Sequence, residues 1–253
     1  MPKHTVSPRI AGVLLAAALL GATPALAQST GDGFLFRTPR ASFTVRAGYD
    51  RAFAGGDLFS FVTSEMTLRR SDFGGFALAA DLAATVSPQL DVVIGLAWSG
   101  SRKASEYRNW WDNNDLPITQ TTALERVPVT ASMKWYARPR GRAVGSFAWI
   151  PARAAPFVGL GLGAMWSRFH QVGDFIDFNT SNNAVFHDDF GSKSWTLTAH
   201  AFAGIEMNVG TRTFVTSEAR YTWARAALGS DFSGYGRMDL SGLSVTAGFG
   251  MRM

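Results

Sequence analysis

The sequence contains no cysteine among its 253 residues. A chain without cysteine has no disulfide framework and no lipid-modified cysteine, so its stability must come from packing or from a membrane. After residue 27 the chain also lacks any apolar run long enough for a membrane-spanning helix. A concentrated basic surface is missing too, because 24 Lys and Arg and 19 Asp and Glu are dispersed along the chain. This dispersal argues against nucleic acid as a partner.

The first 27 residues have the three parts of a secretory signal peptide. Lys3 and Arg9 form a positive region, residues 10–20 form a short apolar run, and Ala25-Leu26-Ala27 matches a small-x-small cleavage site. The apolar run is too short for a membrane anchor. We therefore expect residues 1–27 to be removed on export and residues 28–253 to form the mature domain.

Apolar residues are nevertheless abundant, at 47% of the chain, and they alternate with polar ones. From Leu243 to Met253, every second residue is apolar and the residues between are Ser, Thr, Gly or Arg. A period of two predicts a β-strand with one apolar and one polar face. The same pattern predicts seven more strands, at 43–49, 76–86, 92–98, 127–135, 158–166, 195–209 and 215–223.

The predicted strands are joined by connections of two alternating kinds. Tight turns at 87–90 and 210–212 alternate with long polar segments, which is typical of outer-membrane barrels. Residues 138–155 stand where a short turn is expected; their arginines and Pro151 suggest an ordered, basic periplasmic excursion whose length the pattern does not explain. The long segments are 51–74, 102–122, 170–191 and 226–238.

Aromatic residues mark the ends of the apolar rows. If both termini are periplasmic, these residues fall at two boundaries, as interfacial girdles require. A soluble lipocalin-like barrel, the alternative with eight antiparallel strands, would bury the apolar rows instead. The outer ends carry Tyr49, Phe76, Trp98, Trp166, Trp195 and Trp223, and the inner ends carry Phe43 and Trp135.

The opposite rows collect charged residues. In a dry core each charge costs several kcal/mol unless it is paired, so we expect these rows to face a narrow polar lumen and the apolar rows to face lipid. One interpretation is an internal salt-bridge network that fills the lumen; the other is a path for protons, ions or small solutes. The predicted lumen network is Arg46, Asp81, Arg126, Lys134, His200, Glu206, Glu218, Arg220 and Arg252.

The signal peptide, the eight alternating strands and the terminal strand SGLSVTAGFGMRM resemble the small outer-membrane barrels of the OmpA, OmpX and OmpW type. The resemblance implies an all-β fold, an eight-stranded antiparallel up-and-down transmembrane β-barrel in the outer membrane of a Gram-negative bacterium. It also implies outer-membrane lipid, lipopolysaccharide and the outer-membrane assembly machinery as partners, with a surface ligand left unidentified. Such terminal strands usually end in Phe or Trp, whereas this chain ends in Met253 and has Phe249 four residues earlier. We expect no peptidoglycan-binding domain after the barrel.

An enzymatic alternative is lipid A modification, which some small outer-membrane barrels perform. A serine hydrolase needs a nucleophile, a base and an acid within hydrogen-bond reach, and His200 and Glu218 supply a base and an acid. The lipid A deacylase family, however, has a serine two residues after its histidine, where this chain has Phe202. We therefore expect no catalytic site.

The remaining motifs favour structural roles. The GxGxG run at 159–163 lacks the GxGxxG spacing and the following helix of a dinucleotide site, so we expect its glycines to make room in the lumen for long side chains such as arginines. Residues 57–68 are expected to form a short helix with Asp57 as N-cap and with Leu58, Phe61 and Val62 buried at the barrel mouth.

The third long segment is acidic, and carboxylates suit hard cations, but no fixed ligand spacing appears. We expect a solvated loop there rather than a metal site, and no cofactor. Its ionisable residues are His170, Asp174, Asp177, His187, Asp188 and Asp189.

The leading hypothesis is thus a non-catalytic outer-membrane barrel with a largely plugged polar lumen that supports membrane integrity or surface interaction. The alternative is an OmpW-like passage of small hydrophobic molecules or ions, and lipid A modification is the third.

Overall fold

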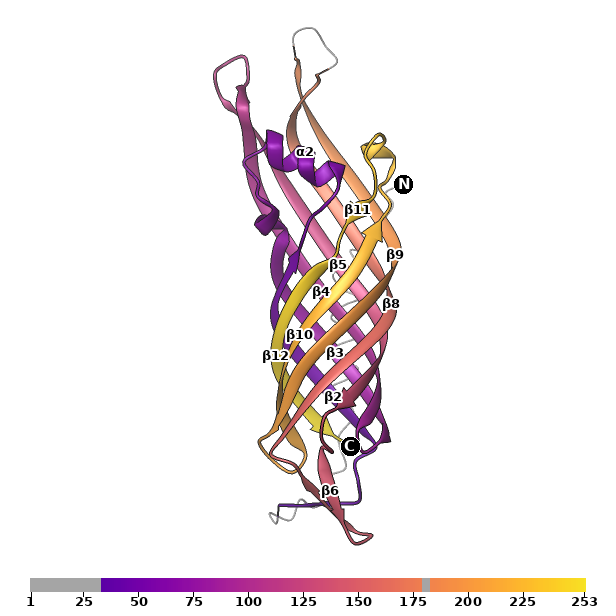
Figure 1. The fold of residues 1–253 in the computed structure, drawn as a ribbon. Helices are drawn as coiled ribbons and strands as arrows, with labels where there is room; N and C mark the ends of the chain where they lie inside the picture. Colours follow the sequence, from indigo (N-terminus) through magenta and orange to yellow (C-terminus); the bar gives the residue numbers. More distant parts are fainter. Residues whose placement is uncertain (1–32, 179–182) are drawn as a thin grey trace, which may run out of the picture. The chain divides into compact units, whose positions relative to one another are not determined.

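Eight long antiparallel strands close into a barrel in the computed structural model, which describes residues 33–178 and 183–253. The predicted signal peptide lies outside the described residues. Each strand pairs with its neighbours along the chain, and the last strand pairs with the first, from Gly242↔Ala52 to Arg252↔Ser42 (Figure 1). The predicted eight-stranded up-and-down barrel is confirmed. Its strands are β2 (Ala41–Ala52), β3 (Gly74–Ser87), β4 (Leu90–Trp111), β5 (Pro117–Tyr136), β8 (Ala154–Ile176), β9 (Val185–Asn208), β10 (Thr213–Ala226) and β12 (Gly242–Arg252).

The outward face of the barrel is apolar. Leu162, Leu197 and Phe249 expose 69%, 86% and 71% of their surface, and none of the outward positions of the eight alternating rows is Lys, Arg, Asp or Glu. Exposed apolar surface costs about 25 cal/mol per Å² in water, whereas lipid removes that cost. An apolar band around a closed barrel is the surface of a membrane-spanning barrel.

Within residues 33–178 and 183–253, no helix is long and apolar enough to cross a membrane.

The predicted girdle residues all lie on this outward face. Tyr49 pairs with Phe76 across β2 and β3, and Trp166 pairs with Trp195 across β8 and β9, so aromatic residues of neighbouring strands stand side by side. Most of the predicted girdle side chains are exposed, whereas two are half-buried within the same face. Their role as anchors at the membrane interfaces stays a prediction. The exposed ones are Tyr49, Phe76, Trp98, Trp135, Trp195 and Trp223, and the half-buried ones are Phe43 and Trp166.

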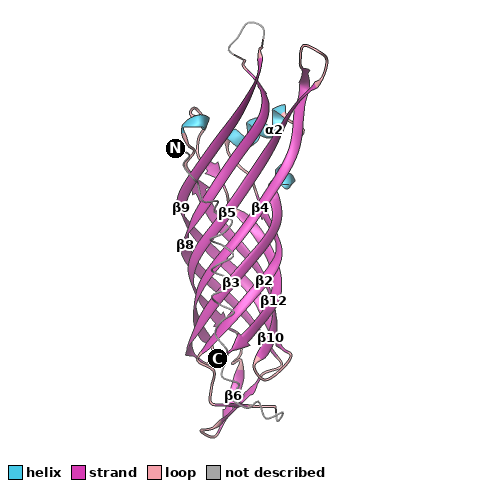
Figure 2. Cartoon of the chain, turned by 180° about the vertical axis from the view of Figure 1, so that it is seen from behind, coloured by secondary structure: helices cyan, strands magenta, loops and turns pink. Residues whose placement is uncertain are grey.

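Two of the four predicted long loops, 102–122 and 170–191, are wrong, because most of their residues continue the barrel strands. We call the end of the barrel at which α2 (Asp57–Glu65) lies the outer end, and the end at which β12 stops the inner end. The pairs β4–β5 and β8–β9 continue as hairpins past the aromatic residues at the outer end (Figure 2). Only residues 112–116 and 177–184 connect their strands. Beyond the lipid the outward face need not be apolar, so the hydrophobic alternation stops while the backbone pairing continues.

The first and fourth connections leave the barrel, as expected. The first contains α2 and the 3-10 turn η1 (Arg70–Phe73), and the fourth contains the 3-10 turn η2 (Ser230–Phe232) and the short strand β11 (Met238–Asp239). Both fold back at the outer end, where α2 lies among the strand ends (Figure 1).

The predicted helix exists but differs in detail. It begins after Gly56, whose φ of 103° a glycine adopts without strain, so Asp57 is the first helical residue and not the N-cap. The helix ends at Glu65 rather than at 68. Leu58 and Val62 are buried as predicted, whereas Phe59 is buried in place of Phe61, which is only half-buried.

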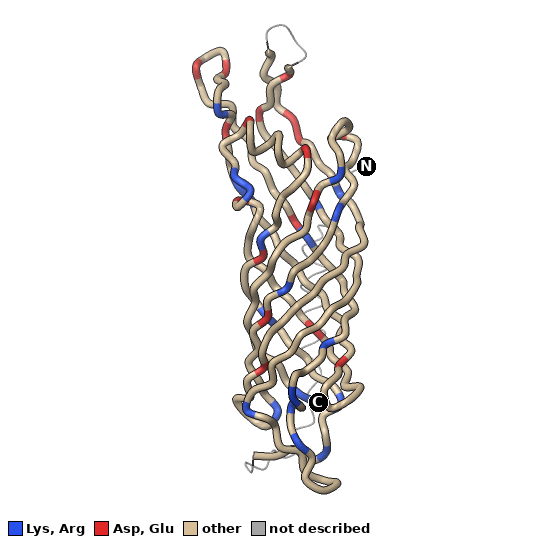
Figure 3. Tube along the Cα trace, in the orientation of Figure 1, with Lys and Arg blue, Asp and Glu red and all other residues tan. Residues whose placement is uncertain are grey.

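The basic segment 138–155 forms an ordered hairpin at the inner end. Its strands β6 (Gly141–Val144) and β7 (Ala148–Pro151) join β1 (Leu35–Phe36) in a separate three-stranded sheet. Arg140 and Trp149 are buried, while the neighbouring arginines are exposed, and Lys and Arg positions surround this end in Figure 3. The segment is therefore longer than a turn because it supplies two of the three strands of this sheet.

Candidate functional site: the charged lumen

The nine charged and histidine residues of the predicted lumen network all point into the barrel. Eight of them are buried, and Arg220 is half-buried. They lie on the rows that alternate with the apolar outward rows, so the membrane itself dictates their placement. The structure brings eight of them together with other charged groups in three clusters, which we call the central, outer and inner clusters, whereas His200 contacts Ser132 instead.

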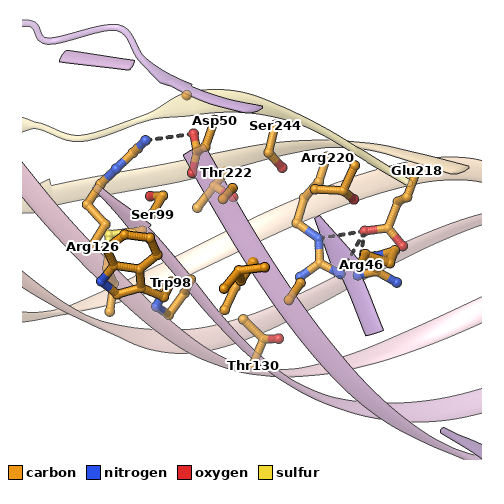
Figure 4. Close-up of a pocket in the computed structure, with 18 residues that line it drawn as sticks. Arg46, Asp50, Trp98, Ser99, Arg126, Thr130, Glu218, Arg220, Thr222 and Ser244 are labelled. Carbon is orange, nitrogen blue, oxygen red and sulfur yellow. Dashed lines mark hydrogen bonds and ion pairs between the residues drawn. The ribbon is translucent and has the colours of Figure 1, made fainter. Parts of the chain in front are cut away.

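The central cluster joins β2, β3 and β10. Arg46 contacts Asp81 at 2.5 Å (Nη1–Oδ2). It also contacts Glu218 at 3.3 Å (Nη2–Oε1), and Arg220 contacts the same Glu218 oxygen at 3.0 Å (Figure 4). Arg46 reaches β10 across β12, where its register partner is Gly248, a residue without a side chain. Two cations and two carboxylates balance one another, as buried charges require.

The outer cluster is a single ion pair. Arg126 contacts Asp50 at 2.6 Å and also donates a hydrogen bond of 2.9 Å to the carbonyl oxygen of Leu240. Asp50 was not predicted as a member of the network. It lies on the same inward row as Arg46, two alternations along, so continuing the period of two would have found it.

A small cavity separates the central and outer clusters. Its volume is about 40 Å³, which is room for only a few water molecules at ~10–15 Å³ of probe space each. Hydroxyl groups line it between the two clusters, from Ser99, Thr130, Thr222 and Ser244 (Figure 4).

The inner cluster centres on Glu206. This carboxylate contacts Lys134 at 2.6 Å and Arg252 at 3.1 Å, and it accepts a hydrogen bond of 2.8 Å from the hydroxyl of Tyr136. A further hydrogen bond of 3.1 Å runs from the Tyr136 hydroxyl to Asp91.

The hairpin β6–β7 completes the inner cluster. Its Arg140 contacts Asp91 at 2.9 Å and donates a hydrogen bond of 2.7 Å to the hydroxyl of Thr85. The prediction missed both charged partners. Asp91 lies on an inward row, so the alternation of its strand could have predicted it. Arg140 lies in a segment without alternation, so no sequence pattern predicts that its side chain enters the lumen.

The three glycines at 159, 161 and 163 face the lumen, but the expectation that arginines fill their space is wrong. A Cβ atom on Gly159 would collide with the ring of Phe202, and one on Gly161 would lie 2.7 Å from Nε2 of His200. Phe202 and His200 are their register partners on β9. A ring on the neighbouring strand thus covers Gly159 and Gly161, an arrangement that helps to fix strand register, whereas a Cβ atom on Gly163 would collide with β5 at Val129 and Thr130.

A large apolar cluster occupies the outer end of the barrel. The ring of Phe59, which is fully buried, lies 4.7 Å from that of Phe73 and 5.7 Å from that of Phe169, and the ring of Phe169 lies 5.4 Å from that of Phe232. The cluster joins α2, η1, β8 and η2. It lies beyond the outer charge cluster, so the charged lumen has an apolar cover on this side.

A buried serine–histidine pair lies in the lumen. Oγ of Ser132 and Nε2 of His200 are 2.8 Å apart, but among the described residues Nδ1 of His200 has no hydrogen-bond partner. Glu218, the predicted acid, is held by Arg46 and Arg220 instead. A pair that is buried and has no orienting acid lacks two requirements of a hydrolase, namely access and a complete triad.

Four of the six ionisable residues of the third segment form cross-strand pairs on the β8–β9 hairpin. His187 contacts Asp174 at 2.8 Å, and His170 contacts Asp189. Among the described residues, no three His, Cys, Asp or Glu side chains gather as a metal site would require. The expectation of a loop here is replaced by an ordered hairpin.

Comparisons with solved structures return small membrane barrels. The neisserial surface protein A aligns at a TM-score of 0.43 with 11% identity, over 88% of this chain and 98% of that one. OprG of Pseudomonas aeruginosa aligns at 0.45 with 13% identity, over 87% and 99%. Ail, the attachment invasion locus protein of Yersinia pestis, aligns at 0.42 with 11% identity, over 84% and 99%. No protein-family model and no curated protein sequence matches the chain.

Proposed function

We propose that the chain is a non-catalytic barrel of the bacterial outer membrane, whose filled lumen makes it a structural component of that membrane. The observation that carries the proposal is the ion-paired filling of the lumen. Ion-paired clusters occupy the lumen in succession, with an apolar cluster at the outer end and the β6–β7 hairpin at the inner end. Buried ion pairs of this kind contribute specificity and shape rather than a path.

The passage of small molecules or ions is less well supported. A pore needs connected space along its axis, whereas the cavity between the central and outer clusters measures about 40 Å³. Lipid A modification is also less well supported, because the Ser132–His200 pair is buried and faces the lumen rather than the lipid. Contact with lipid and lipopolysaccharide is the role that the apolar outward face favours.

The proposal predicts a measurable defect when the protein is missing. In the native bacterium, deletion of the gene should raise the entry of a hydrophobic fluorescent dye several-fold, because a filled barrel seals the membrane that it occupies. Wild-type protein should restore the barrier. A chain without residues 242–253 should not, because it lacks the strand that closes the barrel.

Outer-membrane fractionation and a heat-dependent gel shift report in the same strains whether each chain is folded in the membrane. An unchanged dye entry in a strain that lacks the protein would overturn the integrity role. Recovery of the folded wild-type protein in the soluble periplasmic fraction would overturn the membrane location.

A further inference from the structure

A pocket of about 280 Å³ lies at the outer end of the barrel, beyond the membrane-spanning part of the strands. Its walls come from α2, β4, the β8–β9 hairpin and the segment around η2. We call it the outer aromatic pocket, because aromatic rings form most of its lining. Among them are Phe61, Tyr107, Phe175, Phe190, Phe232 and Tyr235.

The rings hold one another in place. The ring of Phe190 lies 4.9 Å from that of Phe175, at an interplanar angle of 75°, and 6.2 Å from that of Phe232. The rings of Phe61 and Tyr235, which also line the pocket, are 5.8 Å apart and tilted by 53°. The contact between Phe175 and Phe190 is edge-to-face, and contacts between aromatic rings at these separations are favourable, so the rings of the lining support one another before a ligand binds.

The charge of the lining has one sign. Asp177 and Asp231 line the pocket, whereas none of the described lining residues is Lys, Arg or His. The carboxylate of Asp231 is fixed by a hydrogen bond of 3.0 Å from the backbone N–H of Gly191.

The two phenols of the lining add no charge at neutral pH. Burial raises the pKa of Tyr107 and that of Tyr235 above the ordinary value, and both residues lie outside the membrane-spanning segments. The negative charge of the pocket therefore comes from its carboxylates alone.

We propose that the outer aromatic pocket binds a small organic cation, such as a quaternary or protonated amine. Aromatic faces attract cations through their quadrupole, most strongly where water is excluded, and the carboxylates add charge attraction. The volume lies near the lower end of the ~300–1,000 Å³ range of small-molecule sites, which suits a ligand of that size. A neutral apolar ligand would use the rings but gain nothing from the carboxylate of Asp231. This binding activity goes beyond the proposed structural role, which concerns the lumen.

The test compares choline with 3,3-dimethylbutan-1-ol, a neutral molecule of the same shape, by calorimetry on the full chain in lipid nanodiscs. Choline should bind saturably and at least several-fold more tightly than the alcohol. Equal affinities would overturn the proposal, since an uncharged apolar pocket explains them. The absence of saturable choline binding would overturn it as well.

Substitutions of lining residues test whether choline binds in this pocket. Tyr235→Ala should weaken choline binding roughly 2- to 30-fold, the loss expected for one cation–π contact, and Asp231→Asn should weaken choline binding but not binding of the alcohol. Asp115→Asn, an exposed residue of the β4–β5 connection that does not line the pocket, is the matched control and should change nothing. A heat-dependent gel shift confirms that each variant is folded. Unchanged choline affinity in folded Tyr235→Ala and Asp231→Asn would contradict the assignment.

Discussion

Replacement of Glu206 by Gln is expected to lower the free energy of unfolding by about 3–5 kcal/mol, the cost of removing one partner from a buried ion pair. Glu206 is 1% exposed and is the shared partner of Lys134 and Arg252. Without its charge, Lys134, Arg140 and Arg252 would have only Asp91 to balance them. The size of the side chain stays the same, so the loss reports charge rather than packing.

The measurement is urea unfolding in lipid vesicles, followed by tryptophan fluorescence. Glu106→Gln removes a carboxylate from the exposed part of β4 and should change stability by less than about 0.5 kcal/mol. The double variant Glu206→Gln/Lys134→Gln should lose less than the sum of the two single losses, because it restores the net charge of the inner cluster. Equal stabilities of Glu206→Gln and Glu106→Gln would contradict the assigned role of the inner cluster.

Replacement of Phe59 by Ala is expected to cost about 3–5 kcal/mol, as for other fully buried Phe side chains. Phe59 is fully buried in the apolar cluster at the outer end, and its ring contacts those of Phe73 and Phe169. Its loss leaves a cavity between α2 and the barrel. The segment that carries α2 should then become sensitive to protease.

Phe61→Ala on the same helix is the matched comparison, because Phe61 is only half-buried. Unfolding in lipid vesicles measures the loss of unfolding free energy for each variant, and limited proteolysis measures how exposed the segment that carries α2 becomes. The loss for Phe61→Ala should be clearly smaller. Equal losses of stability would contradict the docking of the helix through Phe59.

The membrane-spanning part of the fold was predictable because lipid imposes a simple rule on the sequence. Each residue of a spanning strand faces either lipid or lumen, so the residues from Leu243 to Met253 alternate without exception. Outside the lipid that rule ends. The continuation of β4 to Trp111, the hairpin β6–β7 and the true start of the helix after Gly56 depend on local pairing and turn geometry, which alternation does not encode.

The lumen residues were predictable, but their partners were not. Alternation assigns Lys134 and Glu206 to the inner face, yet they sit on β5 and β9, which are separated by β8. Their contact depends on the stagger of three strands and on the glycine opposite Lys134, Gly159. Such cross-barrel distances depend on the shear of the closed barrel. The shear cannot be predicted from the alternation of residues within one strand.

The filled lumen is tested most directly by the electrical conductance of the purified wild-type protein in planar lipid bilayers. The account predicts no steady open channel. It also predicts none for Phe59→Ala, because the central and inner ion-paired clusters remain when the outer apolar cluster is loosened. A steady open channel in the wild-type protein would contradict the account.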